Sequence, residues 1–121
     1  MNNNILNDLY KLIMERKKTL DIEDDGEKSY TKYLFSQGLN KILKKIGEET
    51  AETIIAAKDV KINASLDNKN LVVGEVADLF YHVFVMLAQL DIDFSEVEQE
   101  LAKRAKKMGN LKEMKAVDKN T

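Results

Sequence analysis

Hydrophobic residues recur at helical spacing in four stretches of the chain, and polar segments separate these stretches. The pattern predicts helices over about residues 4–18 and 39–58, with apolar side chains every three or four positions. A third helix, over about residues 71–90, is apolar nearly all round and should therefore be central. A fourth follows a candidate cap at Asp93 or Ser95 and carries a narrow apolar seam to Met108. Short connections between four main helices predict an all-α, antiparallel helical bundle.

The segments between these helices have the composition of loops and short elements. Residues 21–27 are acidic and end in turn chemistry, so an exposed loop is expected there. Residues 29–35 favour a short helix before Gly38, and residues 63–70 favour a loop. The whole chain, 1–121, is expected to form a single domain, with residues 1–3 and 110–121 frayed.

The apolar third helix also bears on assembly. A bundle of 121 residues offers little surface to cover that helix, and the seams of the outer helices are narrow. A second copy of the chain would bury the remainder. We therefore expect a homodimer.

Composition excludes several classes of function. The absence of Pro and the presence of only five Gly favour long helices, and the absence of Cys excludes disulfides and thiolate metal sites. A net charge of −2 gives no general attraction to nucleic acid. No targeting segment is visible, and Glu75, Asp78 and His82 would make residues 71–90 a costly membrane span. We expect a cytoplasmic protein with no nucleic-acid or membrane partner.

Five carboxylates on two neighbouring predicted helices form the main candidate site. They are Glu48, Glu49 and Glu52 on one helix, and Glu75 and Asp78 on the next. In an antiparallel hairpin the two sets lie at a similar distance from the connecting loop, so they should converge. Carboxylates that close repel one another at pH 7, and a hard cation such as Mg²⁺ or Mn²⁺ would offset the repulsion. The alternative is that these are solvated charges on helix faces.

Basic side chains add a second half to this site. Lys41 and Lys45 precede the carboxylates on the same helix, and Arg104 lies in a basic run on the fourth helix. A divalent cation flanked by Lys and Arg suits a polyphosphate substrate. The basic run also fits helix-dipole complementarity, and His82 alone also fits a structural histidine.

Several motifs together are similar to one enzyme family. They are Ser29-Tyr30-Thr31, Lys44-Lys45-Ile46-Gly47-Glu48-Glu49 with Glu52, Gly74-Glu75-Val76-Ala77-Asp78-Leu79-Phe80-Tyr81-His82, and Arg104 late in the last helix. The chain resembles phosphoribosyl-ATP pyrophosphohydrolases, within the all-α nucleotide pyrophosphohydrolase (MazG-like) superfamily. The resemblance implies a dimeric, Mg²⁺-dependent cytoplasmic enzyme. It would hydrolyse phosphoribosyl-ATP to phosphoribosyl-AMP and pyrophosphate, the second step of histidine biosynthesis.

The resemblance also implies roles for individual residues. By position, Glu49, Glu52, Glu75 and Asp78 would be metal ligands, and Glu48 would be a further ligand or would orient the attacking water. Either Glu48 or Glu49 could serve as the catalytic base. Substrate-binding residues would be Ser29, Tyr30, Thr31, Lys41, Lys45, His82 and Arg104, with residues 29–31 closing over the substrate.

Two other functions are compatible with the same residues. One is a MazG-type house-cleaning enzyme that hydrolyses (deoxy)nucleoside triphosphates. The other is a non-catalytic helical dimerisation module whose acidic patch binds a basic partner. A metal titration separates the module from either enzyme, and a substrate panel separates the two enzymes.

Overall fold

The protein is all-α, as the periodicity predicts. A computed structural model describes residues 4–22, 29–108, 112 and 114–119. Within these residues the elements are α1 (Ile5–Lys18), α2 (Tyr30–Gln37), α3 (Leu39–Ile62), α4 (Leu66–Gln89), α5 (Phe94–Met108) and α6 (Ala116–Lys119). Most of the acidic loop expected over residues 21–27 lies outside the described residues, as do residues 1–3.

Polar side chains fix where the helices begin. Asn4 caps α1, because its side chain accepts a hydrogen bond from the Asn7 amide. Ser29 caps α2 in the same way, and the carboxylate of Asp93 accepts from the Ser95 amide as α5 starts. Between α2 and α3, Gly38 has a φ of 91°, a conformation that side-chain-bearing residues rarely adopt. This glycine lets two helices follow one another directly.

The connection between α3 and α4 is shorter than the sequence indicates. A loop over residues 63–70 was expected, but α3 continues to Ile62 and α4 begins at Leu66. Polar residues 67–70 lie at the start of α4, and all of them except Asn68 are exposed. Ser65 caps this helix by accepting from the Asn68 amide at 3.1 Å, and the Asn68 side chain donates to the Asn63 carbonyl at 2.9 Å. Side-chain capping therefore explains why an Asn-rich segment is helical here.

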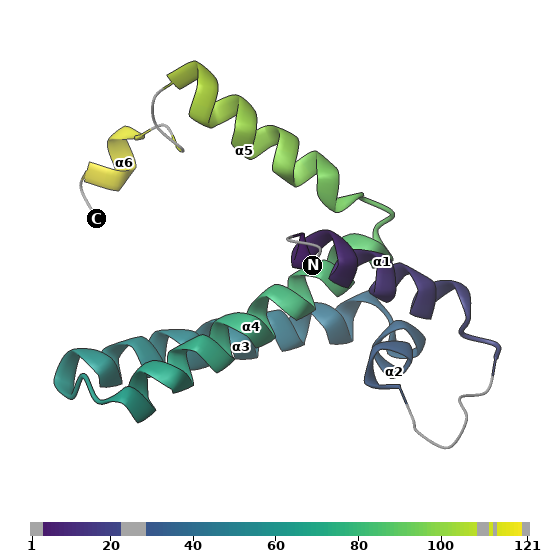
Figure 1. Ribbon diagram of the computed structural model, residues 1–121, viewed down its shortest axis with the longest axis horizontal. Helices are drawn as coiled ribbons and strands as arrows, with labels where there is room; N and C mark the ends of the chain where they lie inside the picture. The colour runs from purple at the N-terminus through teal and green to yellow at the C-terminus, as the bar shows by residue number, and fades with distance from the viewer. Residues whose placement is uncertain (1–3, 23–28, 109–111, 113, 120–121) are drawn as a thin grey trace.

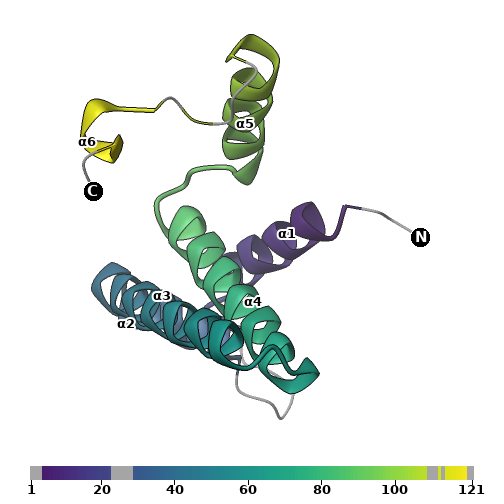
Figure 2. The same cartoon turned by 90° about the vertical axis from the view of Figure 1, so that its left-hand side faces the viewer.

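The longest helices, α3 and α4, pack side by side as an antiparallel hairpin, and α1 crosses the far end of α4 (Figure 1). Figure 2 is viewed from the loop end of the hairpin, and α2 lies behind α3 in it, at that same far end. The core sits where these four helices meet, with Leu34, Ile42 and Val85 fully buried. Tyr10, Phe84 and Phe94 pack ring against ring in it. The loop end of the hairpin extends beyond this core.

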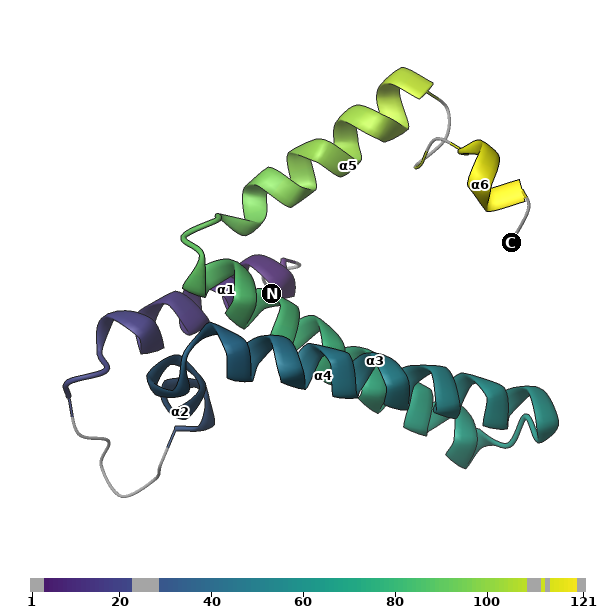
Figure 3. The same ribbon diagram turned by 180° about the vertical axis from the view of Figure 1, so that it is seen from behind.

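A short turn directs α5 away from the hairpin (Figure 3). The Tyr10 hydroxyl donates to the Ile92 carbonyl at 2.6 Å. The Lys17 ammonium donates to the Ala88 carbonyl at 2.8 Å and to the Asp91 carboxylate at 2.7 Å. Asp91 itself has a φ of 56°. Two side chains of α1 thus fix the turn from which α5 departs.

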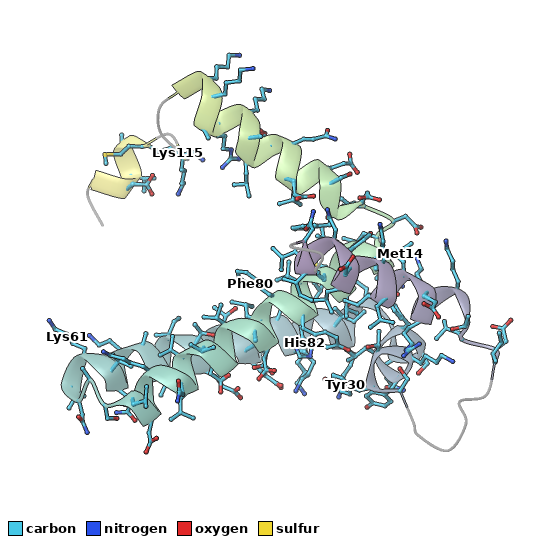
Figure 4. The ribbon with its side chains drawn as sticks, in the orientation of Figure 1. Met14, Tyr30, Lys61, Phe80, His82 and Lys115 are labelled. Carbon is cyan, nitrogen blue, oxygen red and sulfur yellow. The ribbon has the colours of Figure 1, made fainter. Side chains whose placement is uncertain are left out.

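Large apolar side chains remain exposed on both arms of the molecule. On the hairpin they include Ile54, Ile55, Leu71, Val73 and Phe80, and on α5 Leu101 is 49% exposed. Phe80 projects from the side of α4 (Figure 4). Among the described residues, α4 is long and apolar enough to cross a membrane by length and composition alone. A single chain therefore leaves the loop half of its most apolar helix uncovered.

Candidate active site

Three carboxylates from the two hairpin helices meet midway along the hairpin. Glu49 and Glu52 lie one turn apart on α3, and Glu75 faces them from α4. One oxygen of each carboxylate lies within 4.8 Å of the others. We call Glu49, Glu52 and Glu75 the carboxylate trio. The sequence predicts that the five carboxylates of these two helices converge, and the antiparallel packing of α3 on α4 brings these three together.

The trio carries more negative charge than its surroundings neutralise. Glu49 is only 7% exposed, and one oxygen of Glu49 and one of Glu75 are buried without a hydrogen-bond partner among the described residues. Hydrogen bonding to the Glu52 carboxyl, then burial and the charges of Glu52 and Glu49, raises the pKa of Glu75 to about 7. Burial, followed by the charges of Glu52 and Asp78, raises the pKa of Glu49.

This arrangement fits a hard divalent cation. The donors are all carboxylate oxygens, the ligands that Mg²⁺ and Mn²⁺ prefer. Buried oxygens without partners are costly, and a cation among them would satisfy both. Glu52 is exposed, so the trio also opens to solvent on one side.

The other two predicted acidic residues flank the trio. Asp78 is exposed one turn beyond Glu75, and its charge acts on Glu49. Glu48 is paired with a basic neighbour, because one of its oxygens lies 3.1 Å from the Lys45 ammonium. The hydrogen bond from Lys45 lowers the pKa of Glu48, and the charges of Lys45, Lys44 and Lys41 act in the same direction. Lys45 therefore lies near both Glu48 and Glu49, and the charge of Lys41 reaches Glu48.

The start of α2 lies beside the same edge. The Tyr30 hydroxyl is 3.1 Å from Nε2 of His82, and Thr31 hydrogen-bonds to the hydroxyl of Tyr81. Figure 4 shows Tyr30 and His82 next to each other below the core. Burial raises the pKa of Tyr30, and the charges of Lys45, Glu49 and Glu48 act on it too. Tyr81 was not among the residues selected from the sequence; its only signal was its place beside His82.

Arg104 lies apart from the trio within one chain. It sits on α5, with its Nε 3.9 Å from the Glu100 carboxylate. Glu100, Lys103, Arg104 and Lys107 line a pocket of about 470 Å³ on this helix. Because α5 and the hairpin diverge, the basic side chains and the trio occupy different arms of the molecule (Figure 1).

Comparison with known proteins gives a consistent result. A family model described as phosphoribosyl-ATP pyrophosphohydrolase matches residues 6–105. A phosphoribosyl-ATP pyrophosphatase of Listeria welshimeri is 46% identical over 94% of this chain and 98% of its own length. Proteins of the same name from Lactiplantibacillus plantarum and Clostridium novyi are 44% and 41% identical, over 89% and 92% of this chain and 91% and 90% of their own lengths. The matched region contains the trio, Lys41, Lys45 and Arg104.

Proposed function

The chain belongs to the phosphoribosyl-ATP pyrophosphohydrolase family, and from this membership we propose how its carboxylate site works. The protein is a hydrolase of histidine biosynthesis that acts on a phosphoric anhydride. It converts phosphoribosyl-ATP and water to phosphoribosyl-AMP and pyrophosphate. The observation that carries the proposal is the carboxylate trio, with two buried oxygens that lack partners within the described chain.

Glu49, Glu52 and Glu75, with Asp78 beside them, hold Mg²⁺, or Mn²⁺ in its place. When bound, the cation neutralises substrate phosphates and stabilises the charge on the departing pyrophosphate. Glu49 is buried, and so is one oxygen of the half-buried Glu75, which keeps water away from these oxygens and strengthens their electrostatic interactions. The exposed side of the trio, at Glu52, leaves a path for the phosphates.

Hydrolysis requires a base for the attacking water. A P–O bond forms to the water oxygen, the anhydride P–O bond breaks, and the proton passes to Glu48 or Glu49. Glu49 belongs to the trio, which favours Glu48 as the acceptor. Glu48 is ionised at neutral pH, as an exposed carboxyl ordinarily is, and its ion pair with Lys45 lowers its pKa further.

The substrate's phosphates are held by Lys41, Lys45 and Arg104, and residues 29–31 close over the substrate from α2. Lys45 lies near Glu49 of its own chain, and Lys41 precedes Lys45 by about one turn on α3. Arg104 lies on the other arm, so it reaches a trio only on a second copy.

A homodimer accounts for two features of this chain, which are its exposed apolar side chains and the separation of Arg104 from the trio. It covers the apolar side chains exposed on α3, α4 and α5, and its two-fold symmetry delivers each basic α5 to the acidic site of the partner. The working enzyme is thus a cytoplasmic homodimer that takes a small nucleotide and engages neither nucleic acid nor membrane.

A substrate panel tests the proposed function. The purified protein is incubated with Mg²⁺ and equal concentrations of phosphoribosyl-ATP, dCTP or dUTP, and pyrophosphate release is measured. We expect turnover of phosphoribosyl-ATP to exceed that of either triphosphate by at least about a hundredfold in kcat/KM, because a site built to bind the phosphoribosyl group leaves polar groups unpaired with an analogue lacking it. Preference for dCTP or dUTP would instead indicate a MazG-type enzyme. No release from any substrate would favour a dimerisation module.

Mg²⁺ is expected to stabilise the folded protein. Binding to the folded state at 100 times the dissociation constant adds about 2.7 kcal/mol, and relief of repulsion within the trio supplies the affinity. Thermal unfolding with and without saturating MgCl₂ measures the effect, and NaCl at matched ionic strength is the control. An unchanged Tm in MgCl₂ would count against the site.

A further inference from the structure

We infer that His82 is a positioning residue: it holds Tyr30, and through Tyr30 the start of α2, beside the carboxylate trio. This inference rests on the proposed function, in which residues 29–31 bind substrate. It differs from the sequence-based expectation that His82 itself binds substrate. The structural basis is that both nitrogens of the His82 ring are hydrogen-bonded, one within α4 and the other to Tyr30 of α2.

His82 is buried and fully engaged within the protein. His82 is 4% exposed, and its Nδ1 lies 2.8 Å from the backbone carbonyl oxygen of Asp78. A carbonyl oxygen only accepts, so Nδ1 carries the proton and Nε2 is left with a lone pair. The Tyr30 hydroxyl, 3.1 Å away, therefore donates to Nε2. Neither nitrogen remains for a phosphate or a ribose hydroxyl.

A second hydrogen bond runs parallel to the first. Thr31 follows Tyr30 on α2 and hydrogen-bonds to the hydroxyl of Tyr81, which precedes His82 on α4. The ring of Tyr30 stacks on that of Tyr81 with centroids 6.1 Å apart, and it meets His82 edge-on at 5.9 Å. We call Tyr30, Thr31, Tyr81 and His82 the tyrosine clamp. Two adjacent residues of one helix are thus tied to two adjacent residues of the other.

The clamp acts on the part of α2 that faces the site. Tyr30 is the first residue of α2, it is 46% exposed, and Lys45, Glu48 and Glu49 lie close enough to influence its pKa. A ligand at the trio can therefore reach Tyr30, whereas His82 is shielded behind it. Removing the Nε2 acceptor would free the Tyr30 hydroxyl and loosen the first turn of α2.

Two substitutions at His82 separate its two hydrogen bonds. His82→Asn keeps a donor near Nδ1 but removes the acceptor for Tyr30. His82→Gln places an amide oxygen near the position of Nε2 and keeps that acceptor. Tyr30→Phe removes the hydroxyl from the other side, and Tyr30→Phe with His82→Asn completes a double-mutant cycle.

The kinetic readout is KM and kcat for pyrophosphate release from phosphoribosyl-ATP. We expect His82→Asn and Tyr30→Phe each to raise KM roughly tenfold, as loss of one hydrogen bond predicts, with little change in kcat. The double variant should lose no more than either single variant, and His82→Gln should stay within about threefold of the wild type. Additive losses, or a Gln variant as impaired as the Asn variant, would show that His82 meets the substrate itself. A lower Tm with unchanged KM would reduce His82 to a structural residue, and either result overturns the inference.

Hydrogen exchange gives a second readout that needs no catalysis. Backbone amides at the start of α2 should exchange faster in His82→Asn and Tyr30→Phe than in the wild type or His82→Gln. Amides in the middle of α3 serve as the internal reference and should not change. Unchanged exchange in α2 would overturn the inference. If the wild type released no pyrophosphate, the proposed function would fail, and exchange would still decide whether His82 holds α2.

Discussion

Glu75→Gln and Asp78→Asn should each lower kcat for phosphoribosyl-ATP hydrolysis by about a hundredfold or more, because each removes a charged oxygen from the proposed Mg²⁺ site. Both substitutions preserve side-chain shape. Without Mg²⁺ the variants should be as stable as the wild type or more stable, because each removes one charge from a group that repels itself. Steady-state kinetics and thermal unfolding in EDTA measure the two effects.

The pH dependence of stability gives the same prediction a second measurement. The pKa of Glu75 is raised to about 7 in the folded protein, above its ordinary value of 4.5, so the folded state binds a proton that the unfolded state releases. The contribution of this proton to the free energy of unfolding is fully present below about pH 4.5 and is lost as the pH rises through about 7. Glu75→Gln should flatten this decline in the metal-free protein.

Asp59→Asn is the matched control for these variants. Asp59 is an exposed carboxylate on α3 outside the trio, and its neutralisation should leave kcat unchanged. If Glu75 and Asp78 were structural ion-pair partners, their substitution would destabilise the metal-free protein while activity per folded molecule survived. That outcome would falsify their assignment to the metal.

Mixing two variants that are each impaired at low substrate concentration should restore activity if Arg104 acts on the partner's site. Arg104→Ala should raise KM, and Glu75→Gln should lower kcat, within each homodimer. When subunits of the two variants exchange at equal concentrations, half of the dimers are mixed, and each mixed dimer holds one intact site. At substrate concentrations well below KM, activity should therefore approach about a quarter of the wild-type value, as two-fold symmetry requires.

A second mixture controls for non-specific effects of subunit exchange. Glu75→Gln and Asp78→Asn alter the same half of the site, so mixed dimers of these two variants contain no intact site. Their mixture should stay as inactive as its components. If the Arg104→Ala mixture also failed to recover, Arg104 would serve its own chain or lie outside the site.

The acidic site could be predicted from the sequence even though the loop beside it was misplaced. The loop was expected over residues 63–70, whereas the helices meet across residues 63–65. Both helices are longer at this end than the sequence predicts. Glu52 and Glu75 therefore lie farther from the loop than expected, at about 15 and 14 Å along their helices. Because the two displacements are nearly equal, the carboxylates remain opposite each other. In an antiparallel hairpin, the prediction of which residues face each other stays correct when the ends of both helices are misplaced by a similar number of residues.

Two features of the site could not be predicted from the sequence. The direction of α5 depends on hydrogen bonds from Tyr10 and Lys17, which lie more than seventy positions from the turn that they hold. The clamp likewise joins positions about fifty residues apart. Helical periodicity records which face of a helix is apolar, but it carries no information on hydrogen bonds over such separations. The role of His82 therefore became apparent only from its two contacts.

The turn held by Tyr10 and Lys17 makes α5 a lever arm. Arg104 lies ten residues from the start of this helix, at a radius of about 15 Å from the pivot. A rotation of about 10° at the pivot would sweep its guanidinium through about 2.6 Å, nearly the length of a hydrogen bond. In the proposed homodimer, the angular stiffness of the pivot would thus set how accurately Arg104 of one subunit is directed at the site of the other. Residues of α1 that touch no phosphate would control the alignment of a site in a different polypeptide.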